Sequence, residues 1–311
     1  MKLKLDTLLT RMVTSALFNA VLAGVWDTWW HGAIGRDTFL EPPHILLYVA
    51  VVFAIILGVY GYYKTRDKIW KWLAILLVLV PLSAPFDEIW HRIFGVEDIS
   101  TVWAIWSPPH IALIAAITGS LIILLPLIKK DNNFRARRFF GGLCLAAILT
   151  LLVFLTAPLD PTGPYKVLGF YGTGIMSLFI VGIMLISSKW LHGVARATFM
   201  IIIFLLLSSM GWFGEDLSPN VIISPHDHPP NWLAVFSLLV PAVFVDFVSR
   251  RKIPLWLIGG LAGLLWAGIL YGFSSMFFEP QFQYSFMKGL IAAVSGLVGG
   301  VVAGIFISKR T

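Results

Sequence analysis

The sequence has little charge and almost no cysteine. Asp, Glu, Lys and Arg make up 13% of the 311 residues, about half of their share in soluble domains. The single cysteine, Cys144, lies within an apolar run, so the chain can form neither an internal disulfide nor a cluster of thiolates around a metal. Any metal site in this chain therefore has to use nitrogen and oxygen ligands.

Apolar residues take the place of the missing charge. They make up 58% of the chain, which also contains 13 Trp and 23 Phe. Apolar runs long enough to cross about 30 Å of hydrocarbon lie near residues 10–31, 42–63, 69–93, 108–128, 139–159, 167–188, 197–215, 229–248, 255–278 and 284–308. The sequence therefore predicts an all-α fold, a polytopic transmembrane bundle of about ten helices arranged as five hairpins.

The basic residues gather on one side of these predicted spans. Of 23 Lys and Arg, only Arg36, Arg92, Lys166 and Lys288 fall on the other side. Because basic loops stay in the cytoplasm, we expect a multi-pass protein of the cell membrane with both termini cytoplasmic. The net charge of +7 then reflects topology, which predicts the lipid bilayer as a partner and no nucleic acid.

The same division places most carboxylates, and every His except His192, in the turns predicted to face outward. Two of these turns share one pattern. "DTWWH" at 27–31 and "DEIWH" at 87–91 both read D-x-x-W-H, and each is followed by a loop and then by P-P-H-I at the start of the next helix. This shared order indicates a duplicated helix-turn-helix motif.

The spacing within the motif brings potential metal ligands together. Asp27 and His31 are four residues apart, as are Asp87 and His91, so each pair lies on one face of a helix. His44 and His110 follow from the first turn of the next helix, where the preceding prolines are well tolerated. Each hairpin is thus predicted to bring one carboxylate and two imidazoles to a common point.

A third, incomplete copy of the motif lies within residues 197–248. "GEDLSPNVIISPHDHPPNW" keeps an acid and a P-P pair, and its candidate ligands are Asp216, His226 and His228. We therefore divide the chain into residues 1–128, with the two complete hairpins, and residues 129–311, an additional transmembrane region with this possible diverged repeat.

Two His and one carboxylate suit copper, zinc or iron and leave positions open for water or substrate. These residue types do not select among the three metals.

The run D-T-W-W-H-x4-R-D-T-F-x-E-P-P-H, residues 27–44, resembles the copper-binding hairpin of the C subunit of copper membrane monooxygenases, the particulate methane and ammonia monooxygenases. In that family an Asp, a His four residues on and a second His thirteen further on bind copper within the membrane. The resemblance implies copper ligands at Asp27, His31 and His44, and a neighbouring second site at Asp87, His91 and His110.

This resemblance covers roughly residues 10–125 and implies an oxidoreductase. Its copper would activate O2 to oxidise a small apolar or ammonia-like substrate, with other monooxygenase subunits, or further copies of this chain, as partners. The chain departs from the family in its number of helices and in its second half. Two alternatives stay open: a non-enzymatic copper or zinc handler for transport, delivery or assembly, and a zinc-dependent membrane hydrolase.

Overall fold

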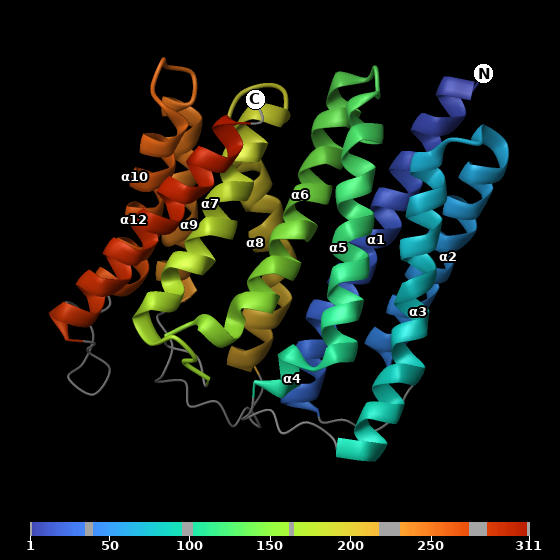
Figure 1. Ribbon diagram of the computed structural model, residues 1–311, viewed down its shortest axis with the longest axis horizontal. Helices are drawn as coiled ribbons and strands as arrows, with labels where there is room; N and C mark the ends of the chain where they lie inside the picture. Colours follow the sequence, from blue (N-terminus) through green and yellow to red (C-terminus); the bar gives the residue numbers. More distant parts are fainter. Residues whose placement is uncertain are drawn as a thin grey trace. The chain divides into compact units, whose positions relative to one another are not determined.

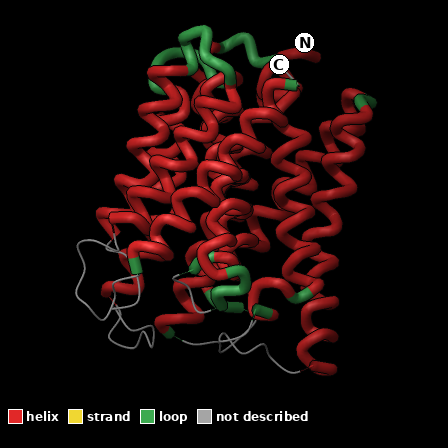
Figure 2. The backbone as a smooth tube through the Cα atoms, turned by 60° about the vertical axis from the view of Figure 1, so that its left-hand side comes forward, coloured by secondary structure: helices red, strands yellow, loops and turns green. Residues whose placement is uncertain are grey.

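The structure is a computed structural model, and it describes residues 2–34, 40–94, 102–161, 165–217, 231–273 and 285–309. Within these ranges the chain consists of helices joined by short loops, without strands, and Figure 2 shows the described loops at the ends of long helices. In the described parts of the chain, eight helices are long and apolar enough to cross a membrane, and the segments Arg196–Ser209 and Trp232–Val248 form shorter apolar helices. The prediction of an all-α, multi-pass membrane bundle is confirmed.

The chain folds into two compact units. The first contains residues 1–151 and 206–221, and the second contains residues 152–205 and 222–311. The first unit holds both copies of the D-x-x-W-H motif. The functional division of the sequence near residue 128 stays a prediction.

Four long helices form the framework of the first unit. Its helices are α1 (Lys2–Ala33), α2 (Pro42–Thr65), α3 (Lys68–Phe94), α4 (Trp103–Trp106), α5 (Pro108–Lys129), most of α6 (Phe134–Thr156) and the C-terminal half of α8 (Arg196–Leu217). Helix α1 packs against α2 and α5, α2 packs against α3, and α3 packs against α5, so these four close into a bundle (Figure 1). Consecutive helices run in opposite directions, which brings the ends of α1 and α3 to the starts of α2 and α5.

Apolar side chains fill the interior of this four-helix bundle. Leu17, Leu73 and Leu121 are fully buried, as is Trp70. Trp70 packs where Gly61 provides space, because a Cβ at position 61 would lie 2.5 Å from the indole ring. A glycine in α2 thus allows a large aromatic ring of α3 to lie within van der Waals distance of the α2 backbone.

The helix starts agree with the P-P-H pattern. Helices α2 and α5 both begin with their proline pairs, and the N-cap positions are held by Glu41 and Ser107 with extended backbones. Neither N-cap side chain makes a capping hydrogen bond. Ser107 therefore occupies the N-cap position of α5 without the hydrogen bond that usually accompanies it.

The second unit is built around close contacts between glycines. It contains α7 (Gly172–Trp190), the N-terminal part of α8, α9 (Asn231–Val248), α10 (Leu255–Ala267) with the π-helical turn η3 (Gly268–Gly272), and α12 (Phe286–Ser308). Helix α12 packs against α10 and α7. A Cβ at Gly263 would collide with the backbone carbonyl of Gly296, so the small residues allow these two helices to approach at backbone distance.

A carboxylate fixes the start of α8 in this second unit. Asp246 of α9 accepts hydrogen bonds from the backbone N–H groups of Ala197 and Thr198 at 2.9 and 2.8 Å and from the Thr198 hydroxyl at 2.8 Å. These donors belong to the first turn of α8, which lacks partners within its own helix. These hydrogen bonds account for a nearly buried carboxylate at position 246 and give Asp246 a structural role.

Candidate metal centre

The first hairpin brings an acid and an imidazole into direct contact. Asp27 lies near the C-terminal end of α1, and His44 lies in the first turn of α2. The Nε2 atom of His44 is 2.9 Å from Oδ1 of Asp27, and the two side chains are 16% and 25% exposed, respectively. The sequence prediction that residues 27 and 44 converge is confirmed at the level of these two side chains.

Glu41 is a third member of this cluster. One ligand atom from each of Asp27, Glu41 and His44 can be chosen so that all lie within 4.8 Å of one another. Glu41 is only 4% exposed, although it is the residue that precedes α2. Glu41 is not among the ligands predicted from the sequence, where its one signal is its position just before the P-P-H motif.

The separation of these atoms can be compared with the geometry of a metal ion. Metal–ligand distances near 2.0–2.2 Å for imidazole nitrogen and carboxylate oxygen place two ligands of one tetrahedral ion about 3.4 Å apart. The 2.9 Å between Asp27 and His44 and the 4.8 Å limit of the cluster bracket that value. The three ligand atoms are therefore spaced on the scale of ligands that share one ion.

The second hairpin repeats the contact in a looser form. The Nε2 atom of His110 lies 3.5 Å from Oδ1 of Asp87, with the side chains 29% and 23% exposed. Ser107 holds the position that Glu41 has in the first hairpin, and it is fully buried. Among the described residues, no third metal-ligating side chain joins this pair.

Tyr48 follows His44 by one turn of α2. Its ring stacks on the His44 imidazole, with ring centroids 6.0 Å apart and an angle of 29° between the planes. The Tyr48 hydroxyl is also within electrostatic reach of the carboxylates of Asp27, Asp87 and Glu41. The two acid–imidazole pairs therefore lie near each other at the same end of the four-helix bundle.

Aromatic rings of α1 flank the first hairpin. Trp30 makes edge-to-face contacts with Trp26 and with Trp29, with ring centroids 6.2 and 6.5 Å apart. On α3, Trp90 packs against Phe94 at 4.3 Å. These contacts identify Trp30 and Trp90 as packing residues of their helices.

The remaining predicted ligands lie outside the described side chains. The backbones of His31 and His91 continue α1 and α3, so the predicted helical spacing from Asp27 and Asp87 is confirmed. Asp216 belongs to the last turn of α8, while His226 and His228 lie outside the described residues altogether. The third candidate site, and the two histidines at 31 and 91 as ligands, stay predictions.

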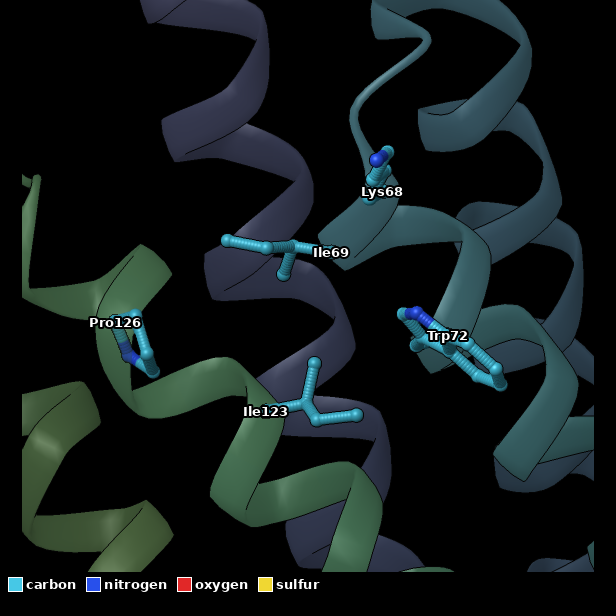
Figure 3. A pocket seen from close by; sticks show the side chains of 5 residues that line it. All are labelled: Lys68, Ile69, Trp72, Ile123 and Pro126. Atoms are coloured by element: carbon cyan, nitrogen blue, oxygen red, sulfur yellow. The ribbon is translucent and has the colours of Figure 1, made fainter.

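Two apolar hollows of the first unit are separate from this cluster. One of about 210 Å³ lies between α3 and α5, where Ile69, Trp72 and Ile123 converge below Lys68 (Figure 3). The other, of about 530 Å³, lies along α1 and α2. Neither is lined by a residue of the Asp27–Glu41–His44 cluster.

Comparisons with models of protein families, with curated proteins and with solved structures found no match to the chain.

Proposed function

We propose that this chain is an integral membrane copper protein related to the C subunit of the copper membrane monooxygenases. The observation that carries the proposal is the cluster of Asp27, Glu41 and His44, whose ligand atoms lie within 4.8 Å of one another. Asp27 and His44 are two of the three residues to which the resemblance assigns copper. The same resemblance adds His31 as a further ligand.

The charges in the cluster favour a bound cation. Two carboxylates this close together repel each other when both are ionised, and the burial of Glu41 makes that repulsion stronger. Within the cluster, His44 supplies at most one positive charge, and only when it is protonated. A divalent cation would offset both carboxylates and would leave His44 neutral, which is the form that binds metals.

The donor set and the resemblance together select the metal. Imidazole nitrogen and carboxylate oxygen accept copper(II), zinc(II) and iron(II), and the resemblance of residues 27–44 favours copper. Asp87 and His110 would form a second site or part of a shared one. Asp87 and His110 offer one oxygen and one nitrogen, so this second site needs His91 or a water to complete it.

Copper supplies redox chemistry with O2 when it is bound. Asp27, Glu41 and His44 would hold it at the end of the bundle. In this proposal the substrate is a small apolar or ammonia-like molecule that reaches the site from the bilayer. Electrons come from a quinol or a partner subunit, and other monooxygenase subunits or further copies of the chain assemble with it.

The positive charge of the loops supports an orientation as well. With the basic loops in the cytoplasm, both termini are cytoplasmic and the cluster lies toward the outer face of the cell membrane. A metal site there would take its ion from outside the cell or from the periplasmic space.

Metal analysis of the protein purified from membranes in mild detergent tests the proposal. We expect copper in the wild type, and a loss of bound copper in His44→Ala and in Glu41→Gln. His192→Ala is the matched control, because His192 is the one histidine at the basic side. Wild-type copper content in both cluster variants would contradict the site, whereas a zinc-loaded, colourless wild type would favour the hydrolase or metal-handling alternatives over the oxygenase.

A further inference from the structure

A groove of about 530 Å³ runs along the surface of the first unit between α1 and α2. Its walls are mainly apolar and include Leu8, Met12 and Ala16 of α1 and Leu46, Val49 and Phe53 of α2. Both helices are apolar and long enough to cross a membrane, so in a bilayer the apolar side chains that line the groove would lie at the depth of lipid tails. An apolar occupant is therefore expected along most of its length.

One end of the groove is cationic. Arg11 lines it together with Phe140 of α6, and the guanidinium lies 5.9 Å from the centre of the Phe140 ring. The Nε and one terminal nitrogen of Arg11 donate to the two oxygens of Asp131 at 2.8 and 3.0 Å. Among the described residues, none bonds to the other terminal nitrogen, whose two N–H groups are left for a further acceptor.

The segment that carries Asp131 has a strong excess of positive charge. Residues 129–138 contain one carboxylate, Asp131, and the cations Lys129, Lys130, Arg135, Arg137 and Arg138. The charge of Arg137 acts on Asp131 along with that of Arg11. The ion pair therefore leaves a net positive charge at the end of the groove.

Farther along α1, the amide of Asn19, which also lines the groove, is directed to its own helix. The amide nitrogen of Asn19 donates to the backbone carbonyl of Ser15 at 2.8 Å. This bond uses the intrahelical carbonyl that lies four residues earlier. This part of the groove thus offers an apolar channel rather than a polar subsite for a ligand headgroup.

We propose that this groove binds an anionic phospholipid, with one acyl chain between α1 and α2 and its phosphate at Arg11 and the basic segment 129–138. Basic pockets beside membrane-spanning helices recognise anionic headgroups in this way. Its volume of about 530 Å³ is within the about 300–1,000 Å³ typical of sites for small ligands. The site is separate from the proposed copper centre and does not depend on it.

Lipid retention by the purified protein tests this site. We would add dioleoylphosphatidylglycerol or dioleoylphosphatidylcholine to the delipidated full chain in detergent, and measure bound lipid by native mass spectrometry and the melting temperature by fluorescence. The wild type is expected to retain the anionic lipid preferentially and to melt at a higher temperature with it. Equal retention of the two lipids would overturn the proposal.

Two valines of α2 provide matched variants. Val49 lines the groove and Val52 does not, and both are well exposed, at 62% and 51%. Val49→Trp fills the groove and is expected to weaken binding of the anionic lipid about tenfold, which corresponds to about 60 Å² of lost apolar contact. Val52→Trp is expected to bind like the wild type, and identical behaviour of the two variants would overturn the proposal.

The charge requirement is tested separately with Arg137→Gln. This variant is expected to reduce the preference for dioleoylphosphatidylglycerol while its binding of dioleoylphosphatidylcholine stays unchanged. Arg250→Gln, in the loop after α9 of the second unit, removes one basic charge elsewhere and serves as its control. An unchanged preference in Arg137→Gln would overturn the assignment of the phosphate to this end of the groove.

Discussion

The His44 Nε2 atom lies 2.9 Å from Oδ1 of Asp27, and this contact joins the end of α1 to the first turn of α2. Such a contact is compatible with a proton shared between the two groups and with a metal ion that binds both. The nearby carboxylate of Glu41 favours the metal ion, because two carboxylates stabilise a divalent cation more than they stabilise a singly charged imidazolium.

The difference between the two hairpins at Glu41 and Ser107 leads to the first prediction. Glu41→Ser gives the first hairpin the N-cap residue of the second, and we expect it to weaken copper binding by more than the about 10–100-fold typical of residues that only support a ligand. Competition with a chelator of known affinity measures the change. Ser107→Ala, which alters the corresponding N-cap of α5, should leave copper affinity unchanged, and an equal loss in both variants would indicate a general effect on helix capping.

The ring of Tyr48 is predicted to position His44. Tyr48→Phe keeps the ring that stacks on the imidazole, whereas Tyr48→Leu removes it. We therefore expect near-normal copper affinity in Tyr48→Phe and about tenfold weaker binding in Tyr48→Leu, the effect expected when support of a ligand is lost. Electron paramagnetic resonance of the copper(II) protein should show an altered ligand field in Tyr48→Leu only. Identical spectra for all three proteins would contradict the positioning role.

The pair of Arg11 and Asp131 is predicted to make stability depend on pH. Burial acts to raise the pKa of Asp131, but hydrogen bonds from Arg11 and the Asn133 backbone, with the charges of Arg11 and Arg137, outweigh it and leave the pKa below its ordinary value. The stabilisation is therefore fully present above the unfolded pKa near 3.8 and is lost as the pH falls through the lower folded pKa.

We expect Asp131→Asn to destabilise the protein at neutral pH by about 1.5–3 kcal/mol, the usual contribution of hydrogen bonds to charged groups. Melting curves in detergent between pH 7 and strongly acidic conditions measure this. The difference between wild type and Asp131→Asn should shrink toward acidic pH, and a difference independent of pH would show that the carboxylate charge is not its source. Asp160→Asn, a half-buried acid of the second unit, provides the comparison.

Close packing of α10 on α12 predicts different effects on stability when two glycines are replaced by alanine. Gly263→Ala places a methyl group against the Gly296 carbonyl, and we expect a loss of about 1–3 kcal/mol from overpacking. Gly268→Ala meets nothing within 4 Å, so its effect should be neutral or slightly stabilising, because Ala is the better helix former. Thermal or denaturant unfolding in detergent distinguishes them, and equal stability of the two variants would contradict this close approach of the helices.

The proposed orientation can be tested with single cysteines, because the native Cys144 is fully buried. Leu40→Cys is in the turn before α2 and Asn132→Cys is in the loop after α5, and both positions are exposed. A thiol reagent that cannot cross membranes should label Leu40→Cys in intact cells and Asn132→Cys only after permeabilisation. The reverse pattern would invert the topology and move the cluster to the cytoplasmic face.

The sequence predicted the helices well because long apolar runs in a membrane protein have few alternatives to helices. The sequence also predicted that Asp27 and His44 converge. The proline pair marks the start of α2, and the spacing of Asp27 and His31 indicates a helix that continues up to the turn before it. The short helix α4 and the π-helical turn at Gly268–Gly272 were not predicted. Both depend on local backbone geometry that leaves little mark on hydrophobic periodicity.

Glu41 shows the limit of reasoning from local patterns. An acid just before a helix usually serves as a cap or interacts with the helix dipole, so its position alone gave no reason to select it as a ligand. Its role in the cluster depends on the approach of α1, which is a tertiary contact. Asp246 is a similar case, because its partners at the start of α8 come from 48 and 49 residues away in the sequence.

Helix α1 is fastened to its neighbours at both ends, through Asp27 to His44 of α2 and through Arg11 to Asp131 of the loop after α5. A rotation of α1 about its own axis would break both contacts, so together they fix the rotational position of the helix. The same helix forms one wall of the lipid groove. A change in the orientation of α1 caused by a bound lipid would therefore also change the distance between Asp27 and His44.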